Sequence, residues 1–323
     1  MKAIRIEKTG GPEVMMLVDV TLPAPGAGEV RVAHTAIGIN FIDTYHRSGL
    51  YPVKLPAGLG MEASGTVTQT GEGVTTIRTG DRIAYCTGPI GAYAGEANVQ
   101  AGRVVKLPPA ISDDIAAAIL LKGMTAEYLL RRTCVVKRGE TILFHAAAGG
   151  VGQIACQWAK ALGATVIGTV GSDEKIAVAK AHGCDHVIVP RKENLAERVR
   201  ALTGGKGVPV VYDGIGKDSF MSSLDCLAPR GLMVSFGNAS GAVPPFEPSI
   251  LSAKGSLYLT RPTLFHYTMT TAELQASADA LFAVIADGSV KIAAPKSYRL
   301  EDAAIAHRDL EGRATTGSLI LKP

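Results

Sequence analysis

The sequence of 323 residues has a single tryptophan, few cysteines and no long uncharged apolar run. Its five cysteines lie far apart and never form a Cys-x-x-Cys pair, which disfavours disulfides and cysteine metal sites. No apolar run approaches the roughly 20 residues that a membrane helix needs, and the first residues lack the apolar core of a signal peptide. We therefore expect a cytoplasmic protein with reduced thiols and no membrane partner.

Neither positive nor negative charge is in large excess. The formal net charge is +4, and the 33 Lys and Arg residues are spread along the chain without a basic block or interleaved aromatic residues. This pattern argues against a nucleic-acid partner. Hydrophobic residues make up 47% of the chain, which is enough material for two hydrophobic cores, and the length favours two domains over one.

The pattern of the chain changes along its length. The first ~120 residues read as short strands broken by glycine and proline, which predicts a small barrel-like β domain. A helical pattern follows Ile111, with Ser112 as its N-cap, and we place a domain boundary near Leu121. Strand-like and helical runs then alternate, with a helix expected at 153–162 and a long one at 271–286. Repeated βα units predict a parallel, doubly wound sheet, because each parallel strand needs a crossover.

A glycine-rich turn follows the first strand of the alternating region. The strand-like run "ETILFHA" leads into Ala147-x-Gly149-x-x-Gly152, with an additional Gly150, and a helix comes next. This is the dinucleotide-binding spacing with alanine in the first glycine place. Amides at a helix start lack intrahelical partners and carry the positive end of the helix dipole, so a diphosphate binds there if no side chain blocks it. The alternative is that the glycines only allow close packing of helix on sheet.

The end of the second strand predicts which dinucleotide binds. NAD-binding proteins usually place a carboxylate there, whereas this corner carries Ser172 and, one turn later, Lys175. A hydroxyl and an ammonium group suit a 2′-phosphate, so NADPH is favoured over NADH. Arg191, after the next strand, adds a second positive charge. Asp173 and Glu174 are the counter-evidence, and we interpret them as first-turn carboxylates that point to solvent.

Four segments together resemble a known family: "AIGINFIDTYHRSGLY", "GLGMEASG", "LLKGMTAEYLL" and "HAAAGGVGQIACQWAKALGA". Over essentially its whole length the chain closely resembles the zinc-independent quinone oxidoreductases, the zeta-crystallin-like branch of the medium-chain dehydrogenase/reductases. The resemblance implies a GroES-like β-barrel catalytic domain (1–121 and 262–323), a Rossmann dinucleotide-binding domain (122–261) with a cofactor cleft at their junction, and a homodimer.

The resemblance also implies that no zinc is bound. Where zinc-dependent relatives have a cysteine three residues before an aspartate, this chain has Asn40 before Asp43, and the histidine before a glutamate is here Met61 before Glu62. The four-cysteine structural lobe of those relatives is missing. Without thiolates, an imidazole or a cysteine cluster, a tetrahedral zinc site has no ligands.

Further cofactor contacts follow from the resemblance. Asn40 and Phe41 would lie by the nicotinamide, Thr125 would face the diphosphate region, and Arg313 would reach in from the tail. Pro190 stands where relatives commonly have a tyrosine that meets the adenosine phosphate. The remaining expected contacts are the backbone at Gly149, Gly150, Val151 and Gly152, the 2′-phosphate ligands Ser172, Lys175 and Arg191, and the ribose and nicotinamide neighbours Phe236, Asn238 and Ser240.

The implied reaction is transfer of the NADPH hydride to a small-molecule quinone. A quinone needs no Lewis acid, because its charge delocalises into a ring that becomes aromatic, so catalysis consists largely of holding two planar rings face to face. The candidate residues for that site are Asn40, Asp43, Tyr45 and Tyr51. Lone histidines such as His145 are expected to be structural.

Two alternatives remain open from the sequence. The same cofactor site could serve an NADPH-dependent reductase of 2-alkenals and other enones, since substrate choice depends on loop shape near Tyr45, Tyr51 and residues 260–267. A hypothesis of another class is an RNA-binding or structural, crystallin-like protein. It would need a basic surface that follows phosphates, for which "VRALTGGKG" and "PRKEN" are the candidates.

Overall fold

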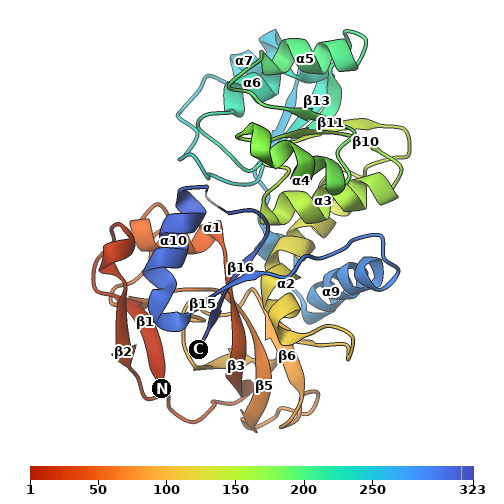
Figure 1. Cartoon of the computed structure of the whole chain (residues 1–323). Helices are drawn as coiled ribbons and strands as arrows, with labels where there is room; N and C mark the ends of the chain where they lie inside the picture. The colour runs from red at the N-terminus through yellow and green to blue at the C-terminus, as the bar shows by residue number, and fades with distance from the viewer. Residues whose placement is uncertain (314) are drawn as a thin grey trace. The chain divides into compact units, whose positions relative to one another are not determined.

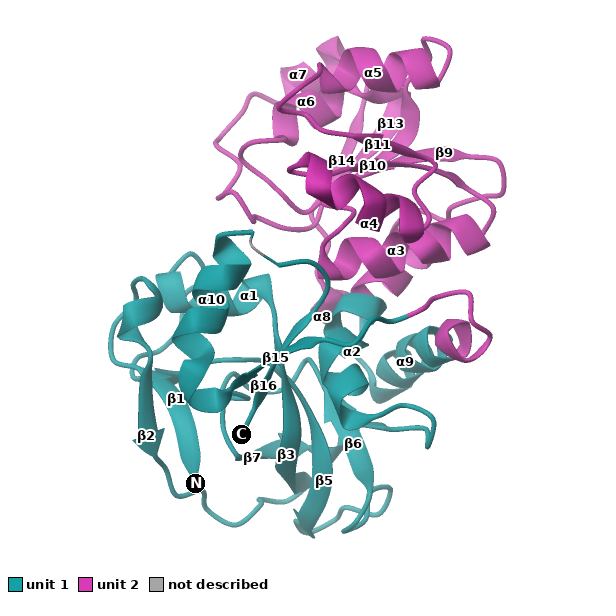
Figure 2. Cartoon of the chain, viewed as in Figure 1, with its two compact units in different colours: residues 1–124, 268–282, 292–323 teal, residues 125–267, 283–291 magenta. Residues whose placement is uncertain are grey.

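The computed structural model describes residues 1–313 and 315–323, which form two compact units (Figure 2). Unit 1 combines both ends of the chain, and unit 2 is built mainly from the middle. Unit 1 comprises Met1–Met124, Thr268–Phe282 and Ile292–Pro323; unit 2 comprises Thr125–Tyr267 and Ala283–Lys291. Among the described residues, no helix has both the length and the apolar character needed to cross a bilayer.

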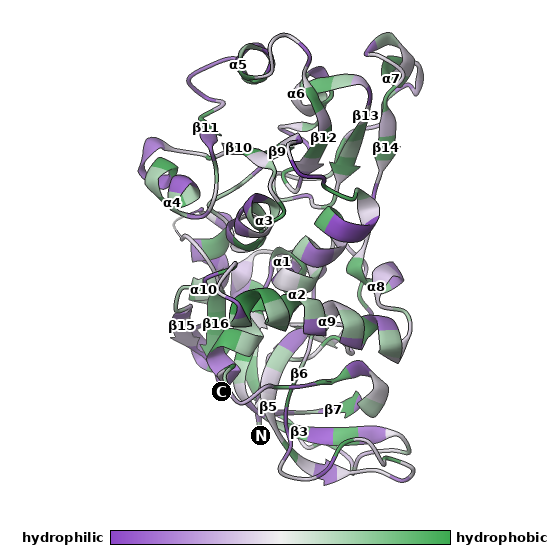
Figure 3. Cartoon of the chain, turned by 90° about the vertical axis from the view of Figure 1, so that its right-hand side faces the viewer, coloured by the Kyte–Doolittle hydropathy of each residue, from purple (hydrophilic) through white to green (hydrophobic). Residues whose placement is uncertain are grey.

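Unit 2 contains a single sheet of six strands, all parallel. Each inner strand contains consecutive buried apolar residues, as expected for a sheet covered on both faces, and Figure 3 shows this hydrophobic character along β12 and β13. The α/β fold class predicted from the alternation is confirmed. In spatial order the strands are β11 (His186–Ile188), β10 (Thr165–Thr169), β9 (Thr141–Phe144), β12 (Val208–Asp213), β13 (Leu227–Ser235) and β14 (Tyr258–Thr260).

The helices of unit 2 mostly connect consecutive strands of this sheet. They are α3 (Gly150–Ala161), α4 (Ile176–Ala181), α5 (Leu195–Leu202), α6 (Phe220–Asp225), α7 (Ser249–Ala253) and α8 (Leu264–Tyr267). Helix α3 starts three residues earlier than the predicted 153–162, because Gly150, Val151 and Gly152 themselves form its first turn.

Two glycines let the first helix approach the sheet closely. A Cβ on Gly152 would lie 2.4 Å from the carbonyl oxygen of Ala146 and 2.7 Å from Cα of Ala147. On the neighbouring strand, a Cβ on Gly168 would lie 2.8 Å from the methyl carbon of Ala147. The alanine in the first glycine place of the motif is thus accommodated by a glycine on β10.

Unit 1 is built on two sheets, and the larger of them joins residues from both ends of the chain. A three-stranded sheet has the order β2-β1-β4, and a seven-stranded sheet has the order β15-β16-β3-β5-β6-β8 with β7 added on β3. Because β16 pairs with β3, the last strand of the chain completes the amino-terminal sheet. The strands are β1 (Lys2–Ile6), β2 (Met16–Asp19), β3 (Glu29–Ile39), β4 (Ala57–Gly58), β5 (Glu62–Thr70), β6 (Arg82–Tyr85), β7 (Glu96–Gln100), β8 (Val105–Lys106), β15 (Lys296–Arg299) and β16 (Leu319–Lys322).

The other α-helices in the described residues are α1 (Phe41–Ser48), α2 (Asp113–Tyr128), α9 (Thr271–Ala286) and α10 (Ala303–Glu311). Helix α10 lies beside α1 in unit 1 (Figure 1). The predicted N-cap of α2 is confirmed, since the amide of Ile115 donates to Oγ of Ser112 over 3.3 Å. Helix α9 has the predicted bounds, 271–286. Helix α1 begins two residues after the end of β3, and three of the four expected catalytic residues, Asn40, Asp43 and Tyr45, lie at its N-cap or within it.

Candidate functional site

The expected cofactor residues of unit 2 gather at one edge of its sheet. The strand order reverses between β9 and β12, and in open parallel sheets ligands bind at the carboxyl ends of the strands beside such a reversal. The glycine turn follows β9, Ser172 follows β10, Arg191 follows β11, and Phe236 follows β13. One edge of the sheet therefore holds residues from four separate loops.

The amides at the start of α3 have no cap. Gly149, the N-cap residue, has extended backbone with φ −83° and no side chain to accept from the helix. Its own amide donates to the carbonyl of Ala146 over 2.8 Å, which closes the turn. Gly149, Gly150 and Val151 are half-buried, and Gly152 packs against the strand. The amides of Gly150, Val151 and Gly152 are thus open to an anion at the positive end of the helix.

The loop after β10 carries residues expected to bind a 2′-phosphate, and one of its two carboxylates forms a salt bridge. Ser172 and Lys175 are half-buried, and Arg191 is exposed. Asp173, one half of the counter-evidence for a 2′-phosphate site, forms a salt bridge with Lys192. Both side chains of that pair are more than half exposed, at 55% and 63%, which agrees with a solvated surface carboxylate.

The loop after β13 is tied to the loop after β12. The amide of Phe236 donates to the carbonyl of Asp213 over 2.8 Å, and the Phe236 ring lies 5.8 Å from that of Phe144. Oγ of Ser240 donates to the carbonyl of Ile215 over 2.9 Å, so this hydroxyl fixes the loop. Asn238 is half-buried between them. Thr125, the other expected contact in unit 2, is buried within α2.

In unit 1 the expected catalytic residues lie at the start of α1. Asn40 is its N-cap residue, and its backbone amide donates to Oδ2 of Asp43 over 2.8 Å. The Asn40 side-chain Nδ2 donates to Oε2 of the fully buried Glu62 over 2.7 Å. The amide orientation of Asn40 is therefore set by a buried carboxylate.

Three aromatic residues of α1 and the following loop form a cluster. The rings of Tyr45 and Tyr51 meet edge to face with centroids 5.2 Å apart, and the Phe41 ring lies 6.5 Å from that of Tyr45. Tyr45 is buried, while Phe41 and Tyr51 are half-buried. The structure thus brings these expected site residues of unit 1 together. Arg313, also in unit 1, lies exposed just after α10.

A chain of hydrogen bonds between buried side chains runs from Asp43 to Glu311 at the surface. The Tyr93 hydroxyl donates to Oδ2 of Asp43 over 3.0 Å and lies 2.9 Å from Nε2 of His307. Nδ1 of His307 lies 2.9 Å from the guanidinium of Arg47, which also binds Glu311 with two hydrogen bonds. Arginine can only donate, so Nδ1 of His307 accepts and Nε2 carries the proton. Every bond therefore points from Arg47 toward Asp43.

Burial sets the protonation of Asp43 and His307 in this chain. It raises the pKa of Asp43 from 3.8 to about 7, despite hydrogen bonds from Asn40 and Tyr93 that act in the opposite direction. The second carboxylate oxygen of Asp43, Oδ1, is buried without a hydrogen-bond partner. Burial, helped by the charge of Arg47, lowers the pKa of His307 to about 3, so this ring is neutral.

Comparison with known proteins places this geometry in a family. The family model described as "Alcohol dehydrogenase GroES-like domain" matches residues 26–137, and the model described as "Zinc-binding dehydrogenase" matches residues 150–283. A quinone oxidoreductase of Pseudomonas aeruginosa is 54% identical over 100% of this chain and 99% of its own length. The chain belongs to the quinone oxidoreductase family.

Solved structures of this family show the same fold. The Escherichia coli quinone oxidoreductase, solved in complex with NADPH, has a TM-score of 0.99 at 52% identity, and the match covers 100% of both chains. A mycobacterial protein, also complexed with NADPH, has a TM-score of 0.97 at 48% identity, again over 100% of both chains. Both the sequence resemblance and the fold predicted from it are confirmed.

One of the two matching family models is named for zinc binding. In this chain Asn40 and Met61 stand at the two expected ligand positions. Among the described residues, no group of three or more His, Cys, Asp or Glu side chains could hold a metal ion. Zinc independence stays a prediction from those ligand positions.

Sequence reasoning gave no role to two buried charges beside Asn40. Lys122 is 6% exposed, and its ammonium donates to the carbonyl of Ile39 over 3.2 Å and lies 3.7 Å from Oε2 of Glu62. Oε1 of Glu62 accepts from the amide of Leu121 over 2.7 Å. The pair therefore fixes both the backbone before Asn40 and its side chain. The only signal in the sequence was a lysine within the otherwise apolar run "AAAILLKGM".

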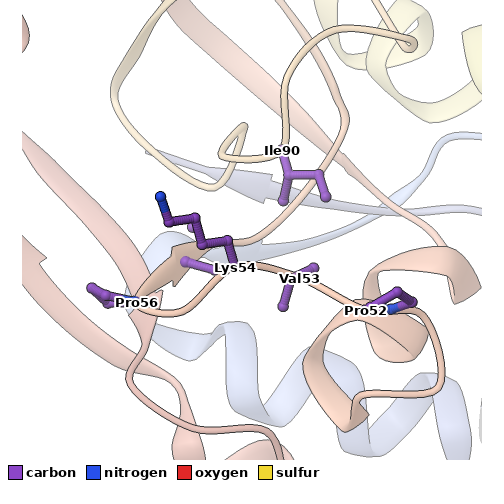
Figure 4. Close-up of a pocket in the computed structure, with 7 residues that line it drawn as sticks. Pro52, Val53, Lys54, Pro56 and Ile90 are labelled. Atoms are coloured by element: carbon purple, nitrogen blue, oxygen red, sulfur yellow. The ribbon is translucent and has the colours of Figure 1, made fainter.

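A pocket of about 370 Å³ lies in the loop that follows Tyr51 (Figure 4). Figure 4 shows Ile90 extending from a separate loop toward Val53, with Lys54 beside them. The pocket is next in sequence to the expected substrate residues, but neither Tyr45 nor Tyr51 lines it.

The raised pKa of Asp43 predicts the pH dependence of stability. The folded protein binds this proton more tightly than the unfolded chain, so the free energy of unfolding should fall by about 2–4 kcal/mol as pH rises from about 4 to 7. Asp43→Asn keeps an acceptor for Asn40 and Tyr93 but carries no charge, and should lose this decline. Urea unfolding between pH 4 and 8 measures it, with the exposed Asp218→Asn as control. Parallel profiles for wild type and Asp43→Asn would contradict the assignment.

Proposed function

We propose that the protein is an NADPH-dependent quinone oxidoreductase. The observation that supports this most is the uncapped start of α3, where the amides of Gly150, Val151 and Gly152 lie at the carboxyl edge of a parallel sheet. Solved relatives with this fold, at 52% and 48% identity, were crystallised with NADPH. The relative from Pseudomonas aeruginosa is a quinone oxidoreductase.

The residues of unit 2 fit an NADPH molecule. The open α3 amides and Thr125 would bind the diphosphate, as anions bind at other helix starts. Ser172, Lys175 and Arg191 would bind the 2′-phosphate, because Asp173 is paired with Lys192 and the neighbouring Glu174 is exposed to solvent. The loop carrying Phe236, Asn238 and Ser240 would bound the ribose and nicotinamide, and from unit 1 Asn40, Phe41 and Arg313 would add contacts.

The residues of α1 hold the quinone rather than activate it chemically. Bound NADPH supplies a hydride. Tyr45 and Tyr51 offer an aromatic surface and hydroxyls for the substrate ring, while Asn40 offers an amide held by Glu62. Asp43 acts through its place in α1, where it holds Asn40 and binds Tyr93. Reduction of a quinone to an aromatic anion requires little proton donation, so correct placement of the rings supplies most of the effect.

A second candidate function is reduction of activated carbon–carbon double bonds. A 2-haloacrylate reductase from Burkholderia is 45% identical over 98% of this chain and 98% of its own length. A solved structure of a 2-haloacrylate reductase has a TM-score of 0.88 with this chain at 44% identity. Reduction of 2-alkenals or enones would use the same cofactor residues, with protonation at carbon as the additional step.

Steady-state turnover distinguishes the two functions. With NADPH we expect kcat/KM for 1,2- and 1,4-quinones to exceed that for 2-alkenals and 2-haloacrylates by at least about 10-fold, because only quinone reduction proceeds without a positioned proton donor. Fast alkenal or haloacrylate reduction beside negligible quinone turnover would reject the first proposal in favour of the second.

Lys175→Ala tests the assignment of the 2′-phosphate site. Loss of a charged hydrogen bond should raise KM for NADPH by roughly 10- to 100-fold, while KM for NADH, which lacks the phosphate, changes little. The control is Lys180→Ala, an exposed lysine on the same helical segment. An equal effect of Lys175→Ala on both cofactors would mean that Lys175 does not bind the phosphate.

The quaternary state, the domain limits and the location complete the proposal. Strand β14 is an edge strand of the unit 2 sheet, and its Tyr258 is 63% exposed, as suits pairing with a second copy. We expect a homodimer of 33.6-kDa chains, and sedimentation at the monomer mass would contradict it.

We assign residues 1–121 and 262–323 to the catalytic domain and 122–261 to the dinucleotide-binding domain. Cytoplasmic location stays a prediction.

A further inference from the structure

Unit 2 contains a buried polar chain that the proposed cofactor contacts do not use. His145 follows β9 and is 3% exposed, and its ring lies between two hydroxyl groups. Its Nδ1 is 2.9 Å from Oγ1 of Thr169, and its Nε2 is 2.9 Å from Oγ of Ser223. Ser223 donates to Oδ2 of the fully buried Asp213 over 2.9 Å. The chain thus joins the carboxyl ends of β9, β10 and β12.

The direction of each hydrogen bond in this chain follows from chemistry. Ser223 gives its proton to Asp213, so its oxygen accepts from Nε2 of His145. Burial lowers the pKa of His145 and keeps the ring neutral, so Nδ1 has no proton and accepts from Thr169. Oγ1 of Thr169 is then left with lone pairs for a backbone amide. That amide belongs to Ala146, 3.4 Å away.

The Thr169 hydroxyl contacts the backbone at Ala146, where the glycine turn begins. Ala146 has φ +52°, a left-handed conformation that an alanine adopts only when its surroundings enforce it. The Ala146 amide faces the Thr169 hydroxyl, and the next amide, of Ala147, donates to the Thr169 carbonyl over 2.9 Å. The Ala146 carbonyl in turn accepts from the amide of Gly149 over 2.8 Å. The conformation of Ala146 therefore sets where α3 starts.

We propose that Thr169, held by His145, Ser223 and Asp213, is a positioning residue that keeps Ala146 left-handed and so presents the α3 amides to the dinucleotide. The inference rests on the proposed cofactor site at this turn. It assigns part of the cofactor affinity to side chains that do not contact the cofactor. The effect concerns the diphosphate, which NADPH and NADH share, and not the 2′-phosphate.

Thr169→Val removes the hydroxyl while keeping the shape of the side chain. It should raise the dissociation constants of NADPH and NADH by the same factor, roughly 3- to 10-fold, as expected for one ordinary hydrogen bond. The value of kcat at saturating NADPH should stay within about twofold. Thr169→Ser keeps the hydroxyl and should retain wild-type affinity. Thr165→Val, a half-buried threonine on the same strand, is the matched control.

A glycine at position 146 tests the role of backbone strain. Glycine adopts positive φ without strain, so Thr169→Val should weaken binding less in an Ala146→Gly background than in the wild type. The same loss in both backgrounds would overturn the inference. If Thr169→Val does not fold, Ser223→Ala gives the same comparison, with Ser222→Ala as its control.

Titration calorimetry separates failure of this inference from failure of the proposed function. If the wild type bound neither nicotinamide, the cofactor site itself would be rejected. If the wild type binds both cofactors and Thr169→Val binds them equally well, only the positioning role is rejected. A loss confined to NADPH would also reject it, because Thr169 would then act on the 2′-phosphate side.

Discussion

The constraint on which the structure of unit 2 depends is the close approach of α3 to the end of β9, which leaves uncapped backbone amides where we propose that the diphosphate binds. The amides of Gly150, Val151 and Gly152 have no acceptor in a cap, since the N-cap residue is a glycine. Their position requires α3 to lie so close to β9 that a methyl group on Gly152 would collide with the backbone of Ala146 and Ala147. Gly168 on β10 then makes room for Ala147. Packing and binding thus impose the same requirement for small residues at one corner of the sheet.

In unit 1, buried polar groups hold the residue at the start of α1 in place. Asn40 is held through its side chain by Glu62, and Lys122 neutralises that carboxylate and binds the carbonyl before Asn40. Buried charges are tolerated only when they are paired and hydrogen-bonded, and this pair meets that condition. Asn40, at the start of α1, is therefore held by charged groups buried beneath it.

Local patterns in the sequence predicted the parallel sheet, the glycine turn and the family, because each depends on residues within a few positions of one another. The pattern did not predict partners that are distant in sequence. Tyr93 and His307 meet across a sequence separation of 214 residues, and nothing near either residue indicates the contact. His145 was expected to be structural and is buried between two hydroxyl groups, but its link to Thr169 and Ser223 depends on the order of the strands. The roles of individual site residues remain predictions for the same reason.

Nuclear magnetic resonance of the ¹⁵N-labelled protein tests the central claim most directly, because it observes the amides themselves. On addition of NADPH, the amide resonances of Gly150, Val151 and Gly152 should shift more than those of exposed turn glycines such as Gly139. NADH should shift the same three resonances, since both cofactors carry the diphosphate. Binding of NADPH that shifts other resonances but leaves these three unchanged would contradict the account.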